Sequence, residues 1–129
     1  MTSLCDVHVE FIRKSGYQDL KSWMDNSNNV YIGRRGVILI NSRRFPEENS
    51  IWANPFKVGK DGDLQEVLNK YYDYITNKII NENLFEELRK LKEKNLGCWC
   101  VGNQIVGLTN PPWICHGQIL MYLVNYYFP

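Results

Sequence analysis

Apolar residues recur at every third or fourth position in two parts of the chain, which is the spacing of amphipathic helices. The first part predicts a helix over 64–80, preceded by Asp63, a residue type that caps helix N-termini. The second predicts a closing helix over 117–128. Between them, Asn83 is expected to cap a further helix that ends at about Lys94. The apolar positions of the first helix are Leu64, Val67, Leu68, Tyr71, Ile75 and Ile79.

Short apolar stretches predict the strands. Residues 7–11 alternate between apolar and polar side chains, the pattern of a half-buried strand. Two further runs, 30–32 and 37–40, are separated by Gly33-Arg-Arg-Gly36 and are expected to pair as a hairpin, since glycine tolerates the turn. The run 96–101 is expected to be a buried strand, and a short helix is expected over 17–24.

Two long segments show neither the helical spacing nor the strand alternation of apolar residues. Residues 41–62 are rich in Arg, Pro, Asn and Gly and predict a loop without strand or helix, and 101–114 predicts another. Loops of this length are uncommon inside compact domains and often carry function. The order of the elements predicts one small α/β domain over 1–129, with a mixed sheet flanked by helices.

The composition narrows the class without naming a chemistry. The 129 residues include 15 Lys plus Arg against 14 Asp plus Glu, a formal charge of +1. This balance argues against a protein held to nucleic acid by its overall charge. No apolar run approaches the ~20 residues of a membrane span, so no membrane partner is expected. The first residues lack a secretory signal, and the four cysteines are expected to be reduced thiols in an intracellular protein.

The cysteines gather in Cys98-Trp-Cys100 and Cys115-His116-Gly117. If the second motif opens the closing helix, it lies beyond the carboxyl end of the preceding strand, where α/β sheets bind ligands. Three interpretations stay open. The cysteines fill a core; or Cys98, Cys100, Cys115 and His116 bind zinc, although adjacent ligands and this spacing are unusual; or Cys115 and His116 form a catalytic or ligand-binding site.

Two further groups of residues point to a ligand. Arg34 follows a strand candidate and Gly33, and its guanidinium matches the geometry of phosphate. Trp52 is expected to anchor its loop in the core, or alternatively to stack on a base while Asn54 orients a ligand edge. For the arginines, a solvated surface is the competing interpretation. The basic residues of this region are Arg34, Arg35, Arg43, Arg44, Lys57 and Lys60.

These motifs together resemble an uncharacterised family, domain of unknown function 4326, found in phages, bacteria and large DNA viruses. The resemblance covers about 30–124 and rests on Val30-Tyr-Ile-Gly-Arg34, Trp52-Ala-Asn-Pro-Phe56, Leu96-Gly-Cys-Trp-Cys100 and Cys115-His116-Gly117. It implies a compact intracellular domain whose motif residues meet at one site, and it supplies no reaction. A viral or phage setting would favour nucleotide or nucleic-acid metabolism. Segments 35–50 and 101–114 are longer here than in the family's usual pattern.

The leading functional hypothesis is a site for a nucleotide-type or other phosphate-bearing ligand, without a cofactor. Cys115 or His116 would carry any chemistry at a nucleotide bond. One alternative is a zinc-stabilised module that binds nucleic acid through its arginines. Another is an adaptor without a ligand, whose segment 35–50 contacts a partner protein. The expected ligand-binding residues are Gly33, Arg34, Trp52, Asn54, Cys98, Cys100 and Gly117.

Overall fold

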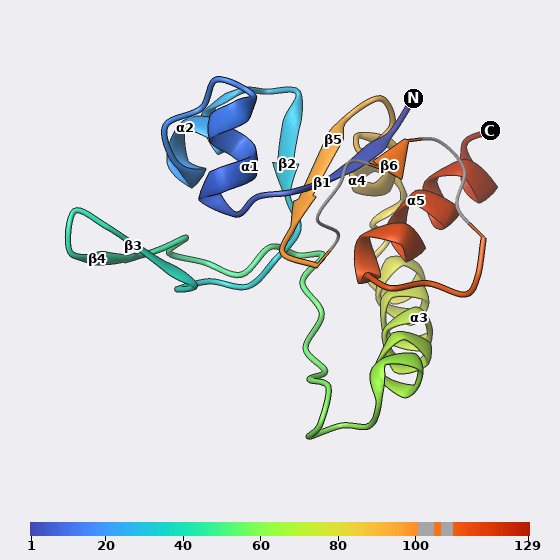
Figure 1. The fold of residues 1–129 in the computed structure, drawn as a ribbon. Coiled ribbons are helices and arrows are strands. Elements are labelled where there is room, and N and C mark those ends of the chain that lie inside the picture. Colours follow the sequence, from blue (N-terminus) through green and yellow to red (C-terminus); the bar gives the residue numbers. More distant parts are fainter. Residues whose placement is uncertain (101–104, 107–109) are drawn as a thin grey trace.

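A four-stranded mixed sheet forms the centre of the computed structural model, which describes residues 1–100, 105–106 and 110–129 (Figure 1). The strand order is β2–β5–β1–β6, with the first three strands parallel and the last antiparallel. These strands are β1 (Ser3–Asp6), β2 (Asn29–Tyr31), β5 (Asn95–Cys98) and β6 (Ile105–Val106). The predicted α/β class is therefore confirmed.

Helices cover both faces of this sheet (Figure 1). Two short helices, α1 and α2, bury Ile12 and Trp23 on one face, while α3 and α5 pack on the other. The helices are α1 (Val9–Lys14), α2 (Leu20–Asp25), α3 (Leu64–Asn81), α4 (Phe85–Arg89) and α5 (His116–Tyr127). Because side chains alternate along a strand, Leu96 and Cys98 of β5 face α5, whereas Gly97 faces Trp23.

The predicted long helix and its cap are confirmed. Helix α3 begins after Asp63, whose carboxylate accepts a hydrogen bond of 2.9 Å from the backbone N–H of Glu66. The Glu66 carboxylate in turn accepts one of 3.2 Å from the backbone N–H of Asp63. This reciprocal pair satisfies two donors that a helix start otherwise leaves to solvent.

Replacing Asp63 with alanine is expected to lower the free energy of unfolding by about 1 kcal/mol, because the N-cap acceptor is lost. Urea denaturation would measure the change. Asp73→Ala is the matched control, since it removes an exposed carboxylate from the middle of the same helix. An equal loss in both variants would show that charge and not capping is responsible.

Several predicted elements were wrong. Residues 7–11 do not form a strand, because β1 lies earlier and Val9 already begins α1. Strand β1 is buried on both faces and so shows no alternation. The cap predicted at Asn83 was also wrong, because α4 begins after Leu84 and is short. Segment 41–62 is not free of strands, since it contains β4 (Arg43–Phe45).

The predicted hairpin between 30–32 and 37–40 was wrong as well. Strand β2 instead pairs with β5 in parallel, and β3 (Ile38–Ile40) pairs with β4 in a separate hairpin that projects from the body (Figure 1). Within the predicted loop 101–114, β6 pairs with β1. The rest of that prediction at 101–104 and 107–109 lies outside the described residues.

The pairing of β2 with β5 positions the candidate site. In this parallel register Tyr31 lies opposite Gly97, so the residues that follow each strand leave the sheet at the same edge. Those residues are Gly33 and Arg34 on one side and Cys100 on the other. Helix α5 starts at this edge too, because the His116 imidazole lies 2.8 Å from the carbonyl oxygen of Ile32.

Candidate functional site

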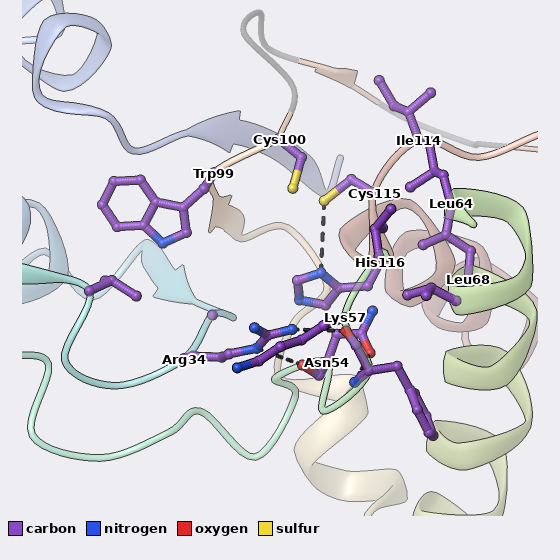
Figure 2. A pocket seen from close by; sticks show the side chains of 15 residues that line it. Arg34, Asn54, Lys57, Leu64, Leu68, Trp99, Cys100, Ile114, Cys115 and His116 are labelled. Atoms are coloured by element: carbon purple, nitrogen blue, oxygen red, sulfur yellow. Dashed lines mark hydrogen bonds between the residues drawn. The ribbon is translucent and has the colours of Figure 1, made fainter. Parts of the chain in front are cut away.

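A cavity of about 420 Å³ opens at the carboxyl edge of the sheet, where segments distant in the sequence meet (Figure 2). Its polar lining comes from Arg34, Asn54, Lys57, Cys100 and His116. Its apolar wall includes Leu64, Val67 and Leu68, which lie in the first turns of α3. The structure thus brings Arg34 and the Cys115–His116 pair to one opening, as the motifs predicted.

Arg34 is half-buried and fixed by the loop it faces. Its Nε donates to the carbonyl of Asn54 at 2.9 Å, and one terminal nitrogen donates to the carbonyl of Phe56 at 2.8 Å. The preceding Gly33 is required by packing, because a Cβ there would lie 2.4 Å from the Tyr31 hydroxyl oxygen. The guanidinium is therefore held in one orientation beside the cavity, with its other N–H groups still able to donate.

Asn54 lies beside Arg34 in a tight local turn. Its side-chain oxygen accepts a hydrogen bond of 2.9 Å from the backbone N–H of Phe56. This bond fixes the direction of the side chain and leaves its amide nitrogen for a ligand. The expectation that Asn54 is held in one orientation at the site is consistent with this geometry.

Trp52 and Gly117 lie in the core and do not line the cavity. The Trp52 side chain is 3% exposed, and its backbone carbonyl accepts a hydrogen bond of 2.7 Å from the Tyr71 hydroxyl. A Cβ at Gly117 would lie 2.4 Å from a methyl carbon of Leu4. The ligand-stacking role considered for Trp52 has no surface to act on, and Gly117 serves helix–strand packing.

Three thiols gather beside the cavity. The sulfur atoms of Cys98, Cys100 and Cys115 all lie within 4.8 Å of one another, and those of Cys98 and Cys115 are 3.0 Å apart. The strand predicted over 96–101 would have included both Cys98 and Cys100, but β5 ends at Cys98. The turn after the strand still brings the sulfurs together, with Cys98 buried and Cys100 exposed.

The thiols differ in acidity. Hydrogen bonds from Cys115 and Cys98 lower the pKa of Cys100, and the nearby His116 acts in the same direction. The hydrogen bond to Cys100 and burial raise the pKa of Cys115 to about 12. Cys115, which the sequence named as a candidate catalytic residue, is therefore the less acidic of these two thiols.

His116 is buried, and burial lowers its pKa, so the ring is neutral. Its Nε2 lies 2.8 Å from the Ile32 carbonyl oxygen and must donate to it, which places the proton on that nitrogen. Its Nδ1 therefore presents a lone pair, 3.9 Å from the sulfur of Cys115 (Figure 2). Cys115 itself is the N-cap of α5, and its sulfur accepts from the backbone N–H of Gly117 at 3.4 Å.

Lys57 and Trp99 line the cavity but were not expected as ligand contacts. Lys57 was noted only as one of several basic residues, and nothing in the local sequence separates it from Lys60. Trp99 also lines the cavity, where its indole N–H donates to the Tyr31 hydroxyl at 2.9 Å. Its place between two motif cysteines was the available signal. By contrast, Arg43 and Arg44 are exposed on the projecting hairpin.

Comparisons with known proteins define the relatives of the chain. The family model described as "Domain of unknown function (DUF4326)" matches residues 16–126. The "Uncharacterized protein R718" of Acanthamoeba polyphaga mimivirus is 35% identical over 97 residues, which cover 73% of this chain and 65% of that protein. No solved structure matches. Among the described residues, no helix has the length and apolar character needed to span a bilayer.

Proposed function

The chain belongs to the DUF4326 family, and from the charge and shape of its cavity we propose that it binds a small phosphate-bearing ligand of nucleotide type. One observation carries the proposal. Arg34 and Lys57 both line the cavity, while the described residues of its lining include no carboxylate. Neither cation forms an ion pair within the described part of the chain. An anionic ligand would complete this charge distribution.

The guanidinium is prepared for such a ligand. Because two backbone carbonyls already hold Arg34, it loses little conformational freedom on binding. Its outward N–H groups match phosphate oxygens, whereas the flexible ammonium of the exposed Lys57 contributes as a point charge. The two residues together favour a terminal phosphate at the mouth of the cavity.

The rest of the cavity suits an apolar or planar group. Side chains of α3, with Val58 and Ile114, form its wall, and its volume falls within the ~300–1,000 Å³ of small-molecule sites. A nucleoside attached to the phosphate would remove this apolar surface from water. The proposal is for binding, and Cys100 and His116 belong to the lining that such a ligand would meet.

Isothermal titration with nucleoside monophosphates and diphosphates, their parent nucleosides and inorganic phosphate tests the proposal. A hydrogen bond to a charged group contributes about 1.5–3 kcal/mol, so Arg34→Ala is expected to weaken nucleotide binding about tenfold or more. Lys57→Ala is expected to weaken it by several-fold, as a more exposed charge. Nucleosides without phosphate should lose the dependence on both residues.

Lys60→Ala is the matched control, because Lys60 is an exposed lysine close in sequence that does not line the cavity. It should bind like the unmodified chain. Thermal melting of each variant separates lost binding from lost folding, which matters for Arg34 since it also holds its loop. The proposal fails if no phosphate compound binds, or if Lys57→Ala and Arg34→Ala, both folded, bind as tightly as the unmodified chain.

A further inference from the structure

We propose that Cys98, Cys100, Cys115 and His116 bind one zinc ion in a closed tetrahedral site. The spacing of the sulfurs carries the first step. With zinc–sulfur bonds of about 2.3 Å, tetrahedral thiolates lie about 3.8 Å apart. The three sulfurs here lie within 4.8 Å of one another, and one pair is 3.0 Å apart, so sub-ångström to ångström side-chain adjustments reach that geometry.

His116 lies outside the group of three sulfurs that are within 4.8 Å of one another, and we assign it as the fourth ligand from the orientation of its ring toward Cys115. Because its Nε2 donates to the Ile32 carbonyl, the Nδ1 lone pair is the one directed at the thiols, 3.9 Å from the Cys115 sulfur. In a tetrahedral site this nitrogen and sulfur would be about 3.6 Å apart. Metal-binding histidines characteristically donate their second N–H to a carbonyl or carboxylate, which fixes the ring as it is fixed here.

The sequence raised the objection that neighbouring residues rarely bind one ion together. The backbone geometry at Cys115 and His116 removes this objection for the pair. Cys115 is the N-cap of α5 and is extended, with φ −147° and ψ 144°, whereas His116 is the first helical residue. This change of backbone conformation lets the two side chains converge on one side of the helix start (Figure 2).

The chemistry of the set selects the metal. Three thiols and an imidazole form a ligand set of closed zinc sites, and the described part of the cluster contains no carboxylate that would favour magnesium or calcium. Binding would release the thiol protons and link the end of β5 to the start of α5. The ion would therefore stabilise one wall of the cavity and the fold as a whole.

The experiment uses the full chain, purified under reducing conditions and stripped of metal with a chelator. Titration with Co²⁺ is expected to give one ion per chain, with the visible absorption of tetrahedral cobalt and a sulfur-to-metal charge-transfer band. Zn²⁺ should displace it. Removing a ligand should weaken affinity by more than about 100-fold, because even loss of an outer hydrogen-bond partner costs about 10–100-fold.

The exposed Cys100→Ser is the main variant, since it should fold where substitutions at buried Cys98 or Cys115 need not. It should also lose about a third of the charge-transfer intensity. Cys5→Ser is the matched control, because Cys5 lies on β1 and donates to the Leu96 carbonyl instead of joining the cluster. The unmodified chain should melt at a lower temperature after chelation.

Four results would overturn the inference. One is a metal-free chain that gains no stoichiometric Co²⁺ or Zn²⁺ in reducing buffer. Another is a six-coordinate cobalt spectrum, or equal loss of affinity in Cys5→Ser and Cys100→Ser. The last is a disulfide between Cys98 and Cys115 that persists in that buffer and excludes the ion, seen as a mass lower by two hydrogens.

Discussion

Replacing Trp52 with alanine is expected to destabilise the protein by about 3–5 kcal/mol, the usual loss when a buried tryptophan is truncated to leave a cavity. The side chain is 3% exposed and belongs to the main core cluster with Tyr71. The variant would also disturb the Trp52 carbonyl that accepts from Tyr71. Urea denaturation followed by circular dichroism would measure the loss.

The conservative variant separates packing from ligand stacking. Trp52→Phe keeps an aromatic ring in the core, and it is expected to recover part of the stability and to bind a phosphate ligand as the unmodified chain does. If Trp52→Ala were as stable as the unmodified chain but lost nucleotide binding, the stacking role would be right. The burial of Trp52 in this structure would then not reflect its role in ligand binding.

The second large effect is expected at Gly117. Alanine there would place its Cβ 2.4 Å from one methyl carbon of Leu4 and 2.9 Å from the terminal carbon of Ile32. Overpacking of this kind costs about 1–3 kcal/mol, which exceeds the gain in helix propensity of about 1 kcal/mol or less. We expect a net loss in free energy of unfolding, measured by the same denaturation experiment.

A double mutant identifies the cause of that loss. Leu4→Val removes the crowding methyl carbons, so Gly117→Ala should cost less in its presence than in the unmodified chain. Residues in contact commonly couple by about 0.5–3 kcal/mol. Strict additivity of the two changes would contradict the packing explanation.

The elements with strong local signals were predictable. Helix α3 combines a long amphipathic repeat with a capping carboxylate at Asp63, and both act within a few residues of chain. Helix α5 also has a local apolar repeat, and it was placed to within about one residue at either end. Such signals depend on neighbours in the sequence, and tertiary contacts had no reason to override them.

The strand partners were not predictable in this way. Val30 pairs with Leu96, far along the chain, while a glycine-flanked turn just after it suggested a local hairpin. Parallel pairing requires a long connection, and no local pattern records which distant strand will be the neighbour. The first strand was predicted at 7–11 and not at β1, because burial of β1 on both faces removes the alternation that identifies a half-buried strand.

The sequence grouped Arg34 with the Cys115–His116 pair, and all three line one cavity, while their roles stay predictions. Arg34 and the Cys115–His116 pair meet because the general arrangement of α/β sheets brings strand ends and a helix start together. The sequence could not decide whether Trp52 faces solvent or core, since an aromatic residue in a loop fits both. It also could not show that Cys100 is the exposed member of the thiol cluster.

The bond from His116 to the Ile32 carbonyl has a thermodynamic consequence. Ile32 lies two residues before Arg34, so one short peptide segment connects the guanidinium to the imidazole. An occupant that draws either side chain away strains or relaxes the other. If binding of an anion changes the affinity of the thiol cluster for a metal ion, binding of the metal ion must change the affinity for the anion by the same factor. The two dissociation constants would therefore report one coupling free energy.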